Sequence, residues 1–200
     1  YVLQGDPESV LAAIRAADAG PHQVIDVIGA DPALDDPVYR AAGYLLDGVE
    51  MLMDRPITMS DREASVDPGV VSTLTSMQID KLNEVWNNGR TANDYRPMLP
   101  AHNTAAGLVQ RFIEVDGEPA AYGRAIVVDR NALLTDVNTF PSFRRRGLGR
   151  IIMLALQNGL AQAGATRVVL TATEMGLPLY EQLGYRTRGQ VRIYVSDDEN

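Results

Sequence analysis

Three observations predict an α/β protein with a mixed, mostly antiparallel sheet flanked by helices. Strand-like segments follow one another between residues 108 and 140, separated by short turn sequences. Two helix-like segments then alternate with two further strands. The first 54 residues repeat the second half of this pattern. At 200 residues the chain is long enough for one domain and part of a second.

The antiparallel part of the sheet is predicted between residues 108 and 140. The segments LVQRFIEV (108–115), AAYGRAIVV (120–128) and ALLTDVNTF (132–140) are rich in β-branched and other apolar residues, which favours strands. The turn sequences DGEP and DRN separate them. Pro141 lacks a backbone donor and ends the third strand. We therefore expect a three-stranded antiparallel meander.

Two crossover units are predicted after the meander. The short second helix has Pro178 in its first turn and Gly184 just after its end, as is typical of helix boundaries. The strand before it, TRVVLTAT, is apolar enough for a sheet that is covered on both faces. The resulting order is strand–strand–strand–helix–strand–helix–strand. Its last four segments are expected at residues 151–164, 166–173, 177–185 and 189–195.

The region before the meander is predicted to hold a short strand, a helix and a long loop. Thr75 or Ser76 is expected to cap the helix. The sequence NNGRTANDYRPMLPAHNT is polar, contains two prolines and is expected to be a long loop or a frayed helix. Loops of this length in compact domains are often lids or binding loops. Helix residues expected to face inward are Met77, Ile79, Leu82 and Val85.

The first 54 residues resemble residues 151–195 in the order helix–strand–helix–strand. After a three-residue insertion, Tyr39 and Gly43 correspond to Tyr180 and Gly184. We expect a duplication whose first copy lacks its front part, which is absent, precedes Tyr1 or is supplied by the other lobe. The predicted divisions are a degenerate first lobe at 1–54, a polar linker at 55–66 and a catalytic domain at 67–200.

Composition excludes several kinds of site. The chain contains no cysteine, which rules out disulfides, zinc–thiolate sites, iron–sulfur clusters and thiol nucleophiles. Its two histidines, His22 and His102, are far apart in sequence, so no metal site is expected. The net charge of −8 argues against binding to nucleic acid or anionic membranes. No apolar run approaches the roughly 20 residues that cross a bilayer. We expect a cytoplasmic protein, either a monomer or a homodimer.

The segment RRRGLG at residues 144–149 predicts an anion site. A strand ends here, the chain turns and a helix begins, so free backbone N–H groups carry partial positive charge. Gly147 and Gly149 lack a Cβ and let an anion approach the backbone, while the arginines add fixed charge. Neither a Walker loop nor a dinucleotide-binding turn fits this spacing. The alternative is a solvated helix start with no ligand.

The spacing Arg-x-x-Gly-x-Gly after a strand resembles the acyl-CoA signature of the GNAT N-acetyltransferase superfamily. The similarity includes TDVNTFPSFRRRGLG and LPLYEQLGY and covers roughly residues 70–196. It implies a GNAT-type fold with acetyl-CoA as co-substrate and no metal. Combined with the internal similarity, it implies a tandem GNAT protein with an incomplete N-terminal repeat.

The resemblance also implies roles for individual residues. Tyr180 is expected to protonate the departing CoA thiolate, with a merely packed aromatic as the alternative. Asp136 is expected to act as the base, or else only as a hydrogen-bonding group. Thr135 occupies the position of the family's usual glutamate, and Glu174 is a weaker candidate base. Residues implied in coenzyme binding are Val137, Asn138, Thr139, Arg144, Arg145, Arg146, Gly147, Leu148, Gly149 and Arg150.

The predicted function is transfer of an acetyl group from acetyl-CoA to a primary amine, by direct attack in a ternary complex. The acceptor is expected to be a small-molecule or peptide amine. The alternative function is a non-catalytic CoA-binding or interaction module on the same fold. Candidate acceptor contacts lie in the loop at 87–97 and are Arg90, Asp94, Tyr95 and Arg96.

Overall fold

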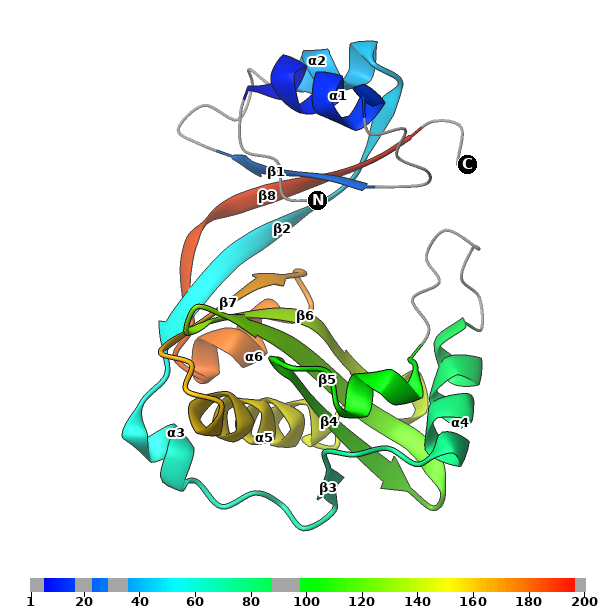
Figure 1. Ribbon diagram of the computed structural model, residues 1–200, viewed down its shortest axis with the longest axis vertical. Helices are drawn as coiled ribbons and strands as arrows, with labels where there is room; N and C mark the ends of the chain where they lie inside the picture. Colours follow the sequence, from blue (N-terminus) through cyan, green and yellow to red (C-terminus); the bar gives the residue numbers. More distant parts are fainter. Residues whose placement is uncertain (1–5, 17–22, 29–35, 88–97, 197–200) are drawn as a thin grey trace. The chain divides into compact units, whose positions relative to one another are not determined.

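The computed structural model describes residues 6–16, 23–28, 36–87 and 98–196 (Figure 1). Contacts divide the chain into two compact units. The smaller unit consists of Tyr1–Leu52, Thr171–Leu177 and Thr187–Asn200, and the larger one of Met53–Leu170 and Pro178–Arg186. Residues 55–66, the expected linker, therefore lie inside the larger unit. The final strand of the expected catalytic domain groups with the N-terminal residues.

The larger unit is built on the antiparallel meander that the sequence predicts. Strands β4 (Leu108–Val115), β5 (Glu118–Val128) and β6 (Asn131–Thr139) pair in this order. Strand β3 (Val70–Val71) extends the sheet beyond β4, and β7 (Arg167–Ala172) pairs with β6 in parallel. The mixed, mostly antiparallel sheet is thus confirmed.

The helices follow the predicted order. Helix α5 (Leu148–Gln162) connects β6 to β7, and α6 (Leu177–Gln182) leads from β7 to β8 (Arg186–Ser196). Among the described residues, the larger unit also contains α3 (Met59–Glu63), α4 (Ser76–Asn87) and the single turns η2 (Pro100–Asn103) and η3 (Pro141–Phe143). No helix in the described part of the chain is both long and apolar enough to cross a bilayer.

Helix α5 packs closely on one face of the meander because β5 carries a glycine there. A Cβ on Gly123 would lie 2.6 Å from Leu156 Cδ1 and 2.7 Å from Ile152 Cγ2, closer than packed carbon atoms approach. Leu156 and Ile152 are fully buried. The glycine therefore sets how near the helix lies to the sheet, and with it the position of the helix start.

The opposite face of the meander packs against α4. Tyr122, the neighbour of Gly123 on β5, points to this face because side chains alternate along a strand. Thr75 caps α4 as predicted: its Oγ1 accepts from Gln78 N at 3.3 Å, and its N–H donates to Gln78 Oε1 at 3.0 Å. The buried cluster on this face is Leu74, Ile79, Leu82, Met98, Phe112, Tyr122 and Phe140.

One prediction about α4 is wrong. Met77 is 66% exposed, whereas Ile79 and Leu82 are buried and Val85 packs against them. The helix begins at Ser76, so Met77 lies in its first turn, on the side away from the stripe that Ile79 and Leu82 form three residues apart.

The smaller unit contains the helix–strand–helix–strand order predicted for the N-terminal segment. Its elements are α1 (Pro7–Ala16), β1 (Gln23–Ile28), α2 (Asp36–Ala41) and most of β2 (Tyr44–Pro56). Strand β8 lies between β1 and β2 and pairs with β1 in antiparallel fashion. The described core of the smaller unit is formed by Leu11, Tyr39, Tyr44 and Tyr194, so Tyr39 has a structural role.

Candidate active site

The arginine–glycine loop forms a sharp double turn between β6 and α5. The turn η3 is closed by hydrogen bonds from Phe143 N to Phe140 O and from Arg144 N to Pro141 O. Arg145 then has φ +62° and Gly147, the N-cap of α5, has φ +80°. Left-handed residues within a turn can aim successive N–H groups toward one side, the arrangement of an anion-binding concavity. The predicted helix start at an arginine–glycine turn is confirmed.

The backbone donors at this turn have no acceptor among the described residues. Arg150 N and Ile151 N donate to Gly147 O and begin the helix. The five preceding N–H groups, from residue 145 to residue 149, make no hydrogen bond in the described part of the chain. Because α5 is 15 residues long, its aligned peptide dipoles add partial positive charge at the same place. An anion such as a diphosphate satisfies these donors.

The three arginines contribute differently. Arg144 Nε donates to Thr139 O at 3.0 Å, and Arg146 Nη2 donates to Ser142 O at 3.1 Å. The Arg146 guanidinium also lies over the Phe143 ring, 5.2 Å from its centroid. These two arginines brace the loop, while their remaining N–H groups stay available to an anion. Arg145 is exposed and makes no ion pair with a described residue.

Strand β6 presents a free backbone edge next to the loop. Its parallel pairing with β7 covers only Asn131–Leu133, so the two strands separate farther along. Phe140 N donates to Ala120 O of β5. Because alternate amides of a strand point to opposite edges, the N–H groups of Thr139 and Val137 point away from β5. This edge can hydrogen-bond an extended, amide-containing ligand as if it were another strand.

A β-bulge at Thr135 marks the middle of β6. Asp136 lies opposite Arg124 and Leu134 opposite Ala125, which leaves Thr135 as the extra residue. A bulge bends its strand and redirects the neighbouring side chains. It therefore accounts for the change of direction of β6 as it leaves β7.

Asp136 is held by an ion pair across the strands. Its Oδ2 accepts from Arg124 Nε at 2.9 Å and Nη2 at 2.5 Å, and from Thr135 Oγ1 at 3.2 Å. Both side chains of the ion pair are largely buried, with 13% exposure for Arg124 and 14% for Asp136. The other oxygen, Oδ1, makes no hydrogen bond with a described residue. Asp136 is therefore held by Arg124 through Oδ2, while Oδ1 is able to accept a proton.

A hollow of about 410 Å³ opens beside the bulge on the α4 face. Arg124, His102 and Thr135 supply its polar groups, and the lining contains no carboxylate in the described part of the chain. A cationic acceptor therefore finds no opposite charge in the lining. The lining residues are His102, Ala105, Ala106, Leu108, Arg124, Ile126 and Thr135.

His102 is a site residue that the sequence does not reveal. Burial lowers the pKa of His102, and the positive charge of Arg124 lowers it further, so the imidazole is neutral near pH 7. Its Nδ1 accepts from Leu99 N at 3.2 Å, which leaves the proton of the neutral ring on Nε2. From the sequence, His102 is considered only as a metal ligand, with no second histidine near it. Its place in the hollow depends on the η2 turn, which the sequence does not predict.

Helix α6, which carries Tyr180, lies against the start of α5. Tyr180 is the fourth residue of α6, is 8% exposed and packs edge-to-face on Tyr185, with ring centroids 5.7 Å apart. Its neighbour Leu179 touches the loop, because a Cβ on Gly149 would lie 3.3 Å from Leu179 Cδ2 and 3.4 Å from Thr139 Oγ1. The structure therefore brings the α6 helix, the start of α5 and the end of β6 together.

The remaining predicted site residues lie in the smaller unit or outside the described residues. Glu174 is exposed and belongs to the smaller unit. The candidate acceptor contacts Arg90, Asp94, Tyr95 and Arg96 lie outside the described residues. No cluster of three or more histidine, aspartate or glutamate side chains suited to a metal occurs among the described residues.

A family model described as "Acetyltransferase (GNAT) family" matches residues 74–185, more than half of the chain. The chain belongs to the GNAT family of acetyltransferases, whose members use acetyl-CoA as co-substrate and act on amine acceptors. The family predicted from the arginine–glycine motif is thus confirmed.

Similar proteins agree with this assignment. The chain is 35% identical over 78 residues to an uncharacterized N-acetyltransferase, YjcF, of Bacillus subtilis, covering 38% of this chain and 56% of that protein. It is 38% identical over 53 residues to the glucosamine 6-phosphate N-acetyltransferase of Trypanosoma brucei brucei, covering 26% and 36% of the two chains. The similarity thus spans little more than half of one curated relative and about a third of the other.

The fold is also that of a solved relative. The structure of a GCN5-related N-acetyltransferase from Kribbella flavida superposes with a TM-score of 0.66 at 23% identity, covering 96% of this chain and 76% of that chain. At this identity the likeness concerns the fold alone. It supports the α/β architecture without identifying a substrate.

Proposed function

We propose that this protein transfers the acetyl group of acetyl-CoA to a primary amine by direct attack in a ternary complex. The five unpartnered N–H groups at residues 145–149 and the free β6 edge at Val137 and Thr139 support this proposal. They match the two parts of coenzyme A that need such donors, the diphosphate and the amide-containing pantetheine arm. The continuity of these two surfaces is the observation that carries the proposal.

The acceptor amine enters through the hollow beside Thr135. An alkyl amine has a pKa of about 10 and must lose a proton before or during its attack. In the proposed reaction its nitrogen bonds to the thioester carbon, and the β6 backbone stabilises the oxyanion. The carbon–sulfur bond then breaks. Asp136, directly or through water, takes the proton from nitrogen, and Tyr180 gives its hydroxyl proton to the thiolate before regaining one from solvent.

Binding and turnover test different parts of this proposal. Calorimetry with coenzyme A tests the anion loop, and release of free thiol from acetyl-CoA in the presence of alkyl amines, amino sugars, aminoglycosides or peptide N-termini tests transfer. We expect coenzyme binding and at least one amine that releases thiol. Coenzyme binding with no thiol release from any of these amines supports the non-catalytic alternative. Absence of coenzyme binding rejects acetyl transfer and a CoA-binding module, and leaves only an interaction module.

The Tyr180→Phe variant separates catalysis from binding. It removes only the hydroxyl and keeps the ring against Tyr185. We expect kcat to fall about 10²-fold or more, the usual contribution of a general acid, with coenzyme affinity unchanged. An unchanged kcat rules out Tyr180 as the acid. It does not contradict the proposed binding of the coenzyme.

We also propose that the N-terminal segment is an incomplete second GNAT copy. Helices α2 and α6 support this: each has six residues, with proline second and tyrosine fourth. Two residues after each helix comes a glycine with nearly the same φ, +83° at Gly43 and +84° at Gly184. Each tyrosine packs edge-to-face on a second one, Tyr39 on Tyr44 at 6.4 Å and Tyr180 on Tyr185 at 5.7 Å.

The duplication is tested by comparing the two segments across related sequences. We expect residues 7–56 to align with residues 148–196 better than shuffled segments of the same composition in most relatives. Similarity no better than the shuffled control rejects the duplication.

We also propose that the protein is a cytoplasmic monomer or homodimer and does not bind nucleic acid. The net charge of −8 supports the lack of nucleic-acid binding. Sedimentation and cell fractionation test assembly and location, and a salt-dependent gel shift with RNA or DNA would contradict the proposed lack of nucleic-acid binding.

A further inference from the structure

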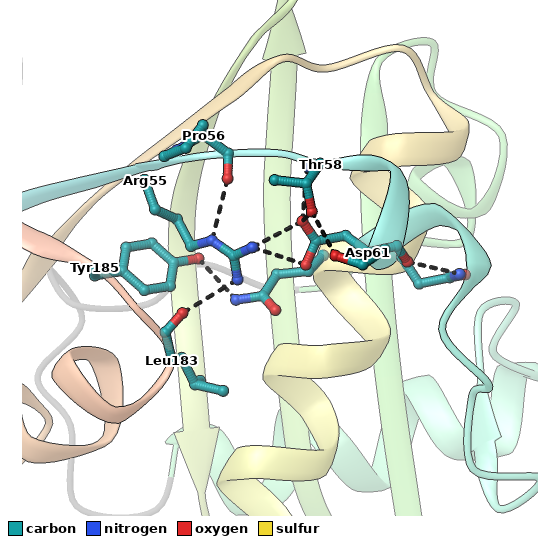
Figure 2. A network of polar contacts seen from close by, with 9 residues as sticks. Arg55, Pro56, Thr58, Asp61, Leu183 and Tyr185 are labelled. Atoms are coloured by element: carbon teal, nitrogen blue, oxygen red, sulfur yellow. Dashed lines mark hydrogen bonds and ion pairs between the residues drawn. The ribbon is translucent and has the colours of Figure 1, made fainter.

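Arg55, in the last part of β2, uses all three nitrogens of its guanidinium in the described structure (Figure 2). Nη2 donates to both carboxylate oxygens of Asp61, at 2.8 Å and 2.7 Å. Nη1 donates to Leu183 O at 3.2 Å, and Nε donates to Pro56 O at 3.1 Å. The guanidinium also lies 5.9 Å from the centroid of the Tyr185 ring. A planar fork with five N–H groups suits such a set of partners, whereas a lysine ammonium does not.

The partner carboxylate is fixed from its own side. Asp61, in α3, is 9% exposed and also accepts from Thr58 N and Thr58 Oγ1, both at 2.8 Å. The exposure of the Arg55 side chain is 13%. A buried ion pair loses about as much in desolvation as it gains in attraction, so stability alone does not account for it. Its clearest effect is to hold the groups around it in one geometry.

Two of the groups that Arg55 contacts are bonded to Tyr180. Leu183 N and Tyr185 N both donate to Tyr180 O at 3.0 Å. The Tyr185 ring packs edge-to-face on the Tyr180 ring. Arg55 therefore donates to the Leu183 carbonyl, directly after the end of α6. It also lies over the face of the Tyr185 ring, which packs on Tyr180. Figure 2 shows Arg55 between Asp61 on one side and Leu183 and Tyr185 on the other.

Helix α5 holds the same tyrosine pair from another direction. Gln157 is 1% exposed, and its Nε2 donates to the Tyr185 hydroxyl at 3.4 Å. Asn158, the next residue, donates to the carbonyl oxygens of Asp61, Arg62 and Ala64 at 3.0–3.1 Å. The segment that carries Asp61 is therefore fastened to the helix whose N-terminus forms the anion loop. Arg55 links that segment to α6.

We propose that Arg55 is a positioning residue that sets where the Tyr180 hydroxyl lies relative to the anion loop. This inference rests on the proposed role of Tyr180 as the acid. Proton transfer to a leaving sulfur requires close alignment, and a displacement of about 1 Å far from the reacting atoms can lower the rate about 10²-fold. Arg55 acts on the rate through α6 and touches neither substrate.

The Arg55→Lys variant tests the proposal. Lysine keeps a positive charge beside Asp61 but cannot reach Leu183 O and the Tyr185 face with the same fork. We expect kcat to fall about 10-fold or more, as for a misaligned acid, with the dissociation constant of acetyl-CoA within about twofold of the parent because residues 144–150 are untouched. The matched control is Arg167→Lys, which alters the Arg167–Asp54 ion pair of 2.9 Å without contacting α6. That control is expected to keep its kcat.

A double-mutant cycle with Tyr180→Phe distinguishes positioning from a general loss of structure. If Arg55 acts through Tyr180, Arg55→Lys has little further effect on kcat once the hydroxyl is gone. Equal fold-losses in both backgrounds overturn the positioning role alone. A Tyr180→Phe variant with parental kcat removes the acid role and this proposal with it. If circular dichroism shows that Arg55→Lys does not fold, Asp61→Asn replaces it, because this variant weakens the Arg55–Asp61 ion pair. Its effect on kcat is expected to be non-additive with Tyr180→Phe in the same way.

Discussion

Arg124 on β5 and Asp136 on β6 face each other in register and form an ion pair of 2.5 Å beside the Thr135 bulge. This pair places a carboxylate next to the hollow and on the strand that borders the proposed thioester position. Two roles for Asp136 are compatible with it: taking a proton and holding Arg124. Variants on the two sides of the pair separate these roles.

Asp136→Asn keeps the shape of the side chain and removes the proton acceptor. We expect its kcat to fall about 10²-fold or more if the carboxylate acts as base. Arg124→Gln breaks the same ion pair but leaves the carboxylate in place, so its loss in kcat is expected to be smaller. Steady-state kinetics on both variants measures the difference. Equal losses would assign Asp136 a structural role only.

The anion loop is tested by Gly147→Ala. Gly147 has φ +80°, a conformation that costs a residue with a Cβ about 1–2 kcal/mol, so the N–H groups around it are expected to shift. We expect acetyl-CoA binding, measured by calorimetry, to weaken about 10-fold. The control is Gly164→Ala, at the other end of α5, where φ is +83° and a Cβ likewise has no neighbour within 4 Å. Equal weakening in both variants would contradict a specific role for the loop.

The contact between α5 and β5 is tested by Gly123→Ala. The new methyl group overlaps Leu156 and Ile152, both fully buried. Overpacking of a core typically costs about 1–3 kcal/mol, and urea unfolding is expected to show a loss in this range. Gly48→Ala, where a Cβ meets nothing within 4 Å, is the control and is expected to change the free energy of unfolding much less. A Gly123→Ala protein as stable as the control would contradict the close packing of α5.

The lowered pKa of His102 predicts a pH dependence of stability. Burial first, and Arg124 second, disfavour the protonated ring in the folded protein, whereas the unfolded chain has the ordinary value of 6.5. The unfolded state therefore binds more protons between the folded and unfolded pKa values, so stability falls as pH decreases below about 6.5. His102→Gln is expected to show a shallower decline in unfolding free energy between pH 8 and pH 5. An identical decline would show that His102 is not the cause.

Local patterns were sufficient for much of the fold. The meander strands begin and end within two residues of their predicted positions, because alternation, turn sequences and Pro141 act over a few residues. The helix start at the arginine–glycine turn was predicted for the same reason. Met77 was placed wrongly because periodicity does not say at which residue the buried stripe begins. The polar segment at 55–66 resembled a linker because the partners of Arg55 and Asn158 lie up to 128 residues away.

By itself, the sequence determined the order of strands and helices, the unpaired amides of residues 145–149 and the family, since each depends on neighbouring residues. Only the tertiary structure decided the bulge at Thr135, the ion pair of Asp136, the hollow that contains His102 and the contact of Arg55 with Leu183. Each of these joins residues distant along the chain, and its energy depends on burial and on distances that arise only when the sheet and helices pack. Local composition carries no information about such distances.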